Sequence, residues 1–199
     1  MIEGLKPSYE RALLPAVHLC SRLGVSPNHI TVLGVALFAA AGWYCATGHW
    51  YTAAAFVTAG ALLDGCDGLL ARVGGRKTDF GAILDSTCDR LTEIAWLAGF
   101  TVYYVRHAGQ EALPVYLCFA ALTGSLMVSY VKARCEGQGV ECRAGILQRP
   151  ERIILLGVCM LLGPEVMVYG LAATAALSWV TVGQRIGVAQ VNARRKARG

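Results

Sequence analysis

The chain has 199 residues, of which 55% are hydrophobic and only 16% are charged, and its mean hydropathy is +0.49. Soluble domains carry about 25% charged residues, so this composition excludes a typical soluble domain, and it also excludes a disordered chain. The net charge of +5 does not come from one concentrated basic patch, so nucleic acid is not an expected partner. The eight cysteines form no CxxC pair, and we expect free thiols.

Long uncharged stretches predict membrane-spanning helices. Leu23–Leu63 is 41 residues long and contains no Asp, Glu, Lys or Arg, which is room for two spans of about 20 residues each. A turn with aromatic side chains interrupts it at Thr47–Tyr51, and Ala112–Val131 is a second uncharged run. We predict an all-α integral membrane protein in one domain (residues 1–199), with an N-terminal amphipathic surface helix at about 9–23 and six transmembrane helices at about 30–47, 53–71, 80–104, 112–131, 148–162 and 166–184.

The distribution of basic residues predicts the orientation. Sixteen of the 18 Lys and Arg residues fall in the N-terminal segment, in alternate loops and in the C-terminal tail. Basic residues concentrate on the cytoplasmic side of membrane proteins. We therefore expect a multi-pass protein of the cytoplasmic membrane, with both termini in the cytoplasm and membrane lipids around its helices.

Two pairs of aspartates interrupt the apolar pattern. Asp64 and Asp67 are spaced i, i+3 in the second predicted span, and Asp85 and Asp89 are spaced i, i+4 in the third, so each pair lies on one helix face. A short loop makes the two helices antiparallel neighbours, so the four carboxylates are expected to converge. Because clustered negative charges need compensation, the pattern favours divalent cations with oxygen ligands. Ion pairs with nearby basic residues are the alternative: Arg72, Arg76, Lys77 and Arg90.

A cation transporter is a second class that such carboxylates allow. A transport site lies near the bilayer midplane, often on broken helices within a repeat. The predicted topology instead puts the aspartates in the cytoplasmic half, and the sequence shows no repeat. A metal-dependent enzyme is therefore favoured over a cation transporter.

Residues 64–89 read DGCDGLLARVGGRKTDFGAILDSTCD. This string resembles the signature D-x2-D-G-x2-A-R-x8-G-x3-D-x3-D of the CDP-alcohol phosphatidyltransferase family. The resemblance implies six transmembrane helices, a homodimer, and displacement of CMP from CDP-diacylglycerol by an alcohol with the help of two Mg2+ ions, or Mn2+. It further implies that Asp64, Asp67, Asp85 and Asp89 are metal ligands, with Asp89 also the catalytic general base.

The same resemblance implies contacts to the CDP-lipid nucleotide. Gly68, Arg72 and Thr78 match family positions of this kind. Residues 27–31 are similar to the Pro-Asn-x-x-Thr segment before the first span, which implies roles for four residues: Asn28, His29, Ile30 and Thr31. The local alternative is that Pro27 ends a loop and Asn28 caps the following helix, and this role is compatible with a nucleotide contact.

The acceptor is indicated by residues 129–152, which read SYVKARCEGQGVECRAGILQRPER. This stretch is similar to the phosphatidylinositol-phosphate synthase subgroup, whose acceptor is inositol 1-phosphate. A phosphate group requires fixed cations, and four residues are candidates: Lys132, Arg149, Arg152 and Arg185. Orientation anchoring is the alternative role for these residues, and glycerol 3-phosphate, as in phosphatidylglycerol-phosphate synthases, is the alternative acceptor. The Gly137–Gly145 loop departs from both subgroups, and Glu93 has no assigned role.

Overall fold

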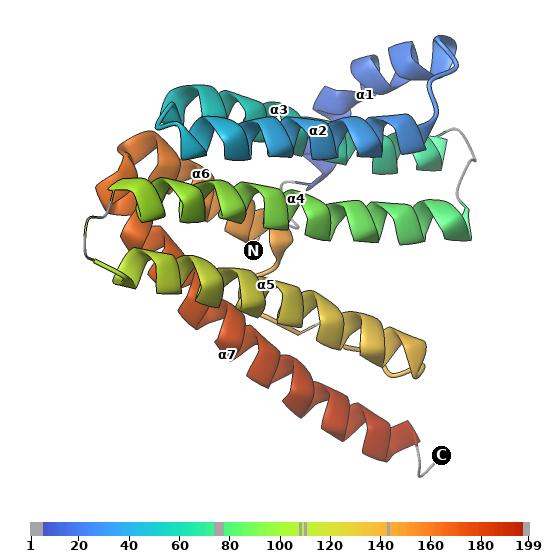
Figure 1. Cartoon of the computed structure of the whole chain (residues 1–199). Coiled ribbons are helices and arrows are strands. Elements are labelled where there is room, and N and C mark those ends of the chain that lie inside the picture. Colours follow the sequence, from blue (N-terminus) through green and yellow to red (C-terminus); the bar gives the residue numbers. More distant parts are fainter. Residues whose placement is uncertain (1–5, 74–77, 108, 110, 143, 197–199) are drawn as a thin grey trace. The chain divides into compact units, whose positions relative to one another are not determined.

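Seven α-helices and no strand make up the part of the chain that the computed structural model describes, which is residues 6–73, 78–107, 109, 111–142 and 144–196 (Figure 1). The helices are α1 (Lys6–Arg22), α2 (Pro27–Ala46), α3 (Trp50–Val73), α4 (Asp79–His107), α5 (Leu113–Gly137), α6 (Arg149–Leu162) and α7 (Pro164–Lys196). Each predicted helix is present. The largest difference is at α7, which continues twelve residues beyond the predicted end at 184.

Proline sets the start of four helices. Pro27 and Pro164 are the first residues of α2 and α7, and Pro114 and Pro150 are the second residues of α5 and α6. Proline fits there because the first helical N–H groups have no partner inside the helix and its fixed φ is already helical. Gly163, with φ +104°, separates α6 from α7. These breaks explain why the sequence predicts the helix starts closely.

Within the described residues, four helices are long and apolar enough to cross a membrane: α2, α3, α5 and α7. This finding fits a multi-pass membrane protein. The other two predicted spans, α4 and α6, do not meet these criteria of length and hydropathy. The first half of α4 is charged, and α6 has 14 residues, which is about 21 Å of helix against a hydrocarbon core of about 30 Å. The number of six crossings therefore stays a prediction.

The chain divides into two compact units, Met1–Gly99 and Phe100–Gly199. In the first unit α2 and α3 run side by side (Figure 1). Close packing of α2 on α4 rests on two glycines, because a Cβ on Gly42 would collide with the Ala95 carbonyl and one on Gly99 with the Gly42 carbonyl. Small residues allow helix backbones to approach in this way. Beside this contact the rings of Phe38 and Trp96 meet edge to face at 5.8 Å.

The N-terminal helix α1 packs on α3. Its Leu13 and Val17 are buried in a cluster with Leu69 and Leu70 of α3 and Ile30 of α2. These two side chains form an apolar contact of α1, and its amphipathic character stays a prediction. Its location at a membrane surface stays a prediction.

In the second unit α7 packs against both α5 and α6. A glycine marks each contact: a Cβ on Gly124 of α5 would lie 2.9 Å from Ser178, and one on Gly170 would lie 2.6 Å from Cys159 of α6. At 33 residues α7 is about 50 Å long, more than a hydrocarbon core requires. All eight cysteines are free thiols, as expected.

Candidate active site

Three carboxylates from two helices converge in the first unit. Asp64 and Asp67 lie in the C-terminal half of α3, and Asp85 lies in the second turn of α4. Each offers one carboxylate oxygen, and the three oxygens lie within 4.8 Å of one another. The structure therefore brings these side chains together as their spacing predicts. Their role as metal ligands stays a prediction.

Asp67 is the most buried of the three, with 5% of its surface exposed. The Thr31 hydroxyl donates a hydrogen bond to its Oδ2 at 2.6 Å, and the Gly68 backbone N–H donates to its Oδ1 at 2.5 Å. Each carboxylate oxygen thus accepts one hydrogen bond, and the two bonds fix the orientation of the side chain. Thr31, predicted as a nucleotide contact, thus orients a carboxylate of the cluster.

Asp89, the fourth predicted ligand and the predicted base, has a different setting. Among the described residues the 4.8 Å cluster consists of Asp64, Asp67 and Asp85 alone. The half-buried Asp89 pairs with the adjacent Arg90, whose Nη1 lies 3.3 Å from Asp89 Oδ2. For Asp89, the alternative of an ion pair with a nearby basic residue is therefore observed. Two further basic residues of that alternative, Arg76 and Lys77, lie outside the described residues.

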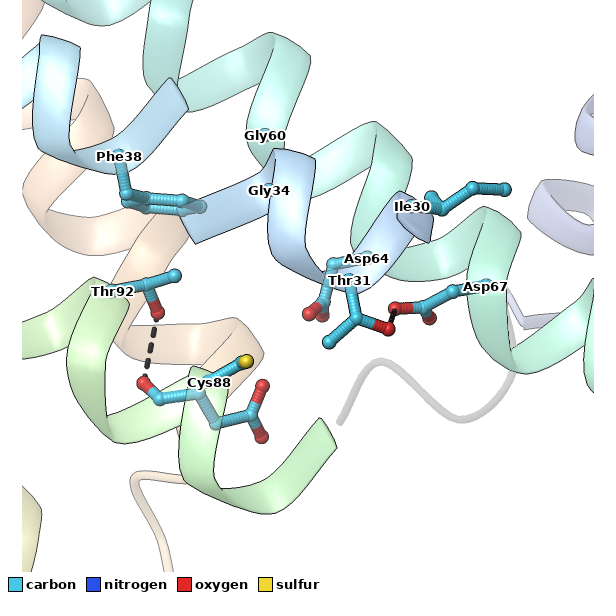
Figure 2. A pocket seen from close by; sticks show the side chains of 10 residues that line it. Ile30, Thr31, Gly34, Phe38, Gly60, Asp64, Asp67, Cys88 and Thr92 are labelled. Carbon is cyan, nitrogen blue, oxygen red and sulfur yellow. Dashed lines mark hydrogen bonds between the residues drawn. The ribbon is translucent and has the colours of Figure 1, made fainter. Parts of the chain in front are cut away.

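A small cavity lies beside the carboxylates (Figure 2). It encloses about 10 Å³, which is about the room that one water molecule requires. In Figure 2, Thr31 on α2 points toward Asp67 on α3. The lining comes from α2, α3 and α4: Ile30, Thr31, Gly34, Phe38, Gly60, Asp64, Asp67, Cys88, Asp89 and Thr92.

Three residues of this lining were not predicted from the sequence, although each lies at helical spacing from a predicted site residue. Gly34 lies three residues after Thr31, Gly60 four residues before Asp64, and Thr92 three residues after Asp89. Residues at these spacings share a helix face. The buried Thr92 also donates a hydrogen bond to the Asp89 carbonyl at 2.8 Å.

Two predicted nucleotide contacts meet at the start of α4. The Thr78 hydroxyl caps this helix by accepting from the Gly81 N–H at 3.0 Å. A Cβ on Gly81 would lie 3.0 Å from Thr78 Oγ1 and 3.5 Å from Asn28 Oδ1, so the glycine leaves room for both side chains. Asn28 and Thr78 are thus brought together although 50 positions separate them in the sequence.

The other predicted nucleotide contacts differ in exposure. Arg72 and His29 are exposed, whereas Ile30 belongs to the apolar cluster that α1 covers. Gly68 is exposed, and a Cβ added there would meet no atom within 4 Å. The backbone of α3 at Gly68 is therefore open to a ligand on that side.

The predicted acceptor residues all lie in the second unit. Lys132, on α5, is exposed and pairs with Glu136 at 3.7 Å. Arg149 begins α6 and is half-buried, and Arg152, one turn later, is 2% exposed. The Arg152 Nη1 donates to the Leu147 carbonyl at 3.3 Å.

Arg185 of α7 is also buried, with 4% of its surface exposed. Its Nε donates to the Ala144 carbonyl at 2.8 Å and its Nη1 to the Val128 carbonyl at 2.6 Å. Arg152 lies near enough for the two positive charges to repel each other. A pair of buried guanidinium groups suits an anionic ligand, because an anion offsets that repulsion.

The clustered aspartates fit a hard divalent cation. Such cations prefer oxygen ligands, and carboxylates are the most common of these in proteins. The three clustered residues supply carboxylate oxygens from two helices within 4.8 Å. The fold and this site define a helical, multi-pass membrane protein with a candidate divalent-metal site.

The chain belongs to the CDP-alcohol phosphatidyltransferase family, whose sequence model matches residues 24–185. It is thus an enzyme of a family of phospholipid-biosynthetic transferases. A similar protein is the archaetidylinositol phosphate synthase of Methanothermobacter thermautotrophicus, 36% identical over 94% of this chain and 92% of that protein. Another is the phosphatidylinositol phosphate synthase of Corynebacterium glutamicum, 35% identical over 94% of this chain and 88% of that protein.

Solved structures of the phosphatidylinositol phosphate synthase of Mycobacterium tuberculosis share the fold. The structure with bound CDP-DAG has a TM-score of 0.82 and 29% identity, covering 90% of this chain and 94% of that chain. The structure in complex with manganese and citrate has a TM-score of 0.82 and 30% identity, covering 88% of each. That manganese complex and the aspartate cluster together indicate use of a divalent metal.

Proposed function

We propose that this protein transfers a phosphatidyl group from CDP-diacylglycerol to inositol 1-phosphate, forming phosphatidylinositol phosphate and releasing CMP. The observation that carries the proposal is that three aspartates of the family signature lie close together in space: Asp64, Asp67 and Asp85. The names of the similar bacterial synthases support this acceptor.

The donor is bound through its cytidine nucleotide and pyrophosphate. Asn28 and Thr78, which lie together at the start of α4, are proposed to contact the nucleotide. Gly68 leaves the α3 backbone open for its approach, and Arg72 adds a positive charge. His29, Ile30 and Thr31 complete the proposed segment, with Thr31 acting through Asp67.

The aspartates are proposed to hold two Mg2+ ions, with Mn2+ as a substitute. When bound, such ions would neutralise the pyrophosphate oxygens and stabilise the charge on departing CMP. The residues that would hold them are Asp64, Asp67, Asp85 and Asp89. Asp89 accepts the proton of the acceptor hydroxyl as this oxygen attacks the β-phosphorus. The bond from the β-phosphorus to the oxygen that bridges to CMP breaks at the same centre.

The acceptor phosphate is proposed to bind four cationic side chains: Lys132, Arg149, Arg152 and Arg185. Arginine forks match the geometry of phosphate oxygens. The burial of Arg152 and Arg185 supports this role over simple anchoring, because an anchoring residue keeps its charged end in water.

We further propose that the protein works as a homodimer in the cytoplasmic membrane. Its six spans would leave both termini and the active site in the cytoplasm, where the soluble acceptor is found. An ether-lipid donor is a second candidate, favoured by the similarity to an archaetidylinositol phosphate synthase.

The test is CMP release by the purified full-length chain from CDP-diacylglycerol with Mg2+. Inositol 1-phosphate, glycerol 3-phosphate, free inositol and serine are compared as acceptors, and a CDP-linked ether lipid is compared as donor. We expect CMP release with inositol 1-phosphate only. Release with glycerol 3-phosphate alone would contradict the acceptor assignment while keeping the family chemistry. No release with any pair from a folded protein would contradict the proposal as a whole.

A further inference from the structure

One face of α7 holds the connection between α5 and α6. We call residues 138–148, apart from residue 143, the docked segment. Four side chains of α7 bond to its backbone: Thr181 Oγ1 accepts from the Leu147 N–H at 3.2 Å, Arg185 Nε donates to the Ala144 carbonyl at 2.8 Å, Asn192 Nδ2 to the Glu141 carbonyl at 2.8 Å, and Lys196 Nζ to the Gln138 carbonyl at 2.8 Å.

These contacts follow a regular pattern. The α7 residues are separated by four, seven and four positions, which places them on one helix face. Their partners are separated by three positions and run in the opposite direction along the chain. The docked segment therefore lies antiparallel along α7. Its path is fixed through backbone atoms, independently of its side chains.

The backbone of the docked segment comes very close to α7 beside Thr181. Thr181 is fully buried, and a Cβ on Gly145 would lie 2.5 Å from its Cγ2 atom. Gly145 also has φ +141°, which disfavours any other residue. The segment is thus pressed against α7 at this point.

Leu147 connects this contact to the acceptor residues. Its N–H is bound by Thr181, and its carbonyl accepts from Arg152 Nη1 at 3.3 Å. A buried guanidinium is oriented by the acceptors around it. A displacement of Leu147 would therefore turn the Arg152 side chain.

We propose that Thr181 is a positioning residue that acts through Leu147 to orient Arg152 toward the acceptor phosphate. The inference rests on the proposed function, since it assigns Arg152 to that phosphate. Thr181 is not proposed to touch the substrate, so its loss weakens acceptor binding and leaves the CDP-lipid site intact.

The chain offers a matched control. Thr174 lies two helical turns before Thr181 on the same face of α7 and is equally buried. Its hydroxyl has no hydrogen-bond partner among the described residues. Thr174→Val and Thr181→Val are thus the same chemical change in similar surroundings, and only the second removes a hydrogen bond to the docked segment. Thr181→Ser keeps the hydroxyl.

Two readouts are measured on the full-length variants. The first is the KM for inositol 1-phosphate and the KM for CDP-diacylglycerol in the CMP-release assay. The second, which needs no activity, is hydrogen–deuterium exchange of peptides covering residues 144–152. For Thr181→Val we expect the acceptor KM to rise about fivefold, the CDP-lipid KM to change by less than about twofold, and exchange at 144–148 to accelerate. Thr181→Ser and Thr174→Val should resemble the wild type.

Equal behaviour of Thr181→Val and Thr174→Val in both readouts would overturn the inference. An equal rise of both KM values in Thr181→Val would overturn it too, because it would indicate a general structural role. A wild-type protein that releases no CMP with inositol 1-phosphate would instead contradict the proposed function. The acceptor assignment would then fall with it, while the exchange data would still decide whether Thr181 holds the segment.

Discussion

At the scale of single residues, Asp67 shows how a membrane protein keeps a carboxylate in a buried place. Both of its oxygens accept a hydrogen bond, from the Thr31 hydroxyl and from the Gly68 N–H. Each oxygen retains a second lone pair, so a cation can still be bound. The residues that orient the cluster therefore come from α2 and α3 together.

Asp89 is the proposed general base, and its replacement tests that role. Replacement by Asn keeps the size of the side chain but removes the proton acceptor. We expect turnover of Asp89→Asn to fall by about 100-fold or more, the contribution of a general base, while CDP-diacylglycerol binding is partly kept because the other three aspartates remain. CMP release and calorimetric titration of the lipid measure the two effects.

Asp79 provides the control. It lies at the exposed start of the same helix, outside the cavity and outside the carboxylate cluster. Asp79→Asn should keep its turnover, because it removes a charge of the same kind without touching the site. Wild-type turnover in Asp89→Asn would refute the assignment of the base.

At the scale of helices, close packing against α2 positions α4, the helix that carries Asp85 and Asp89. Gly42 and Gly99 form this contact, where neither position has room for a Cβ. Gly99→Val should force the helices apart at a cost of about 1–3 kcal/mol and lower the thermal midpoint by about 5 °C in detergent. Gly183→Val is the matched change, because a Cβ at that position of α7 meets nothing within 4 Å. Similar midpoints for the two variants would show that the glycine contact is unimportant.

Much of the helical framework could be predicted from the sequence. Proline marks the starts of α2, α5, α6 and α7, and the uncharged runs mark α2, α3 and α5. The end of α7 was missed because the apolar run stops near Gln184, whereas Ala, Gln, Arg and Lys continue the helix to Lys196. Apolar periodicity reports burial, and this last part of α7 is mostly exposed.

The candidate site was predictable where local spacing decides it. The i, i+3 pair Asp64 and Asp67 and the nearby Asp85 converge because helix geometry and a short connection require it. The bond from Thr31 to Asp67 and the docking of Leu147 on Thr181 were not predictable, because they join residues 36 and 34 positions apart. Such contacts depend on how the helices pack.

At the scale of the whole molecule, the number of membrane crossings separates two topologies. In the described part of the chain, four helices have the length and hydropathy of a membrane span, whereas the proposed topology has six spans. If α4 and α6 also cross, the connection that contains Glu111 lies on the side opposite the termini. If they do not, it lies on the same side as the termini.

Glu111→Cys in the full-length chain decides between the two. With six crossings, we expect a membrane-impermeant maleimide to label this exposed position in intact cells. Glu136→Cys, at the exposed end of α5, should be labelled only after the cells are broken. The native cysteines are buried or half-buried, so the unmodified chain gives the background. Absence of labelling at residue 111 in intact cells would refute the six-span topology.

Phosphatidyl transfer at the aspartate cluster yields defined products, which can be identified. The full-length protein is incubated with CDP-diacylglycerol, inositol 1-phosphate and Mg2+, and the lipids and nucleotides are identified by mass spectrometry, with an EDTA-treated sample as control. We expect phosphatidylinositol phosphate and CMP in equal amounts, with neither formed in EDTA. Phosphatidic acid as the lipid product, or transfer that persists in EDTA, would contradict the proposed transfer.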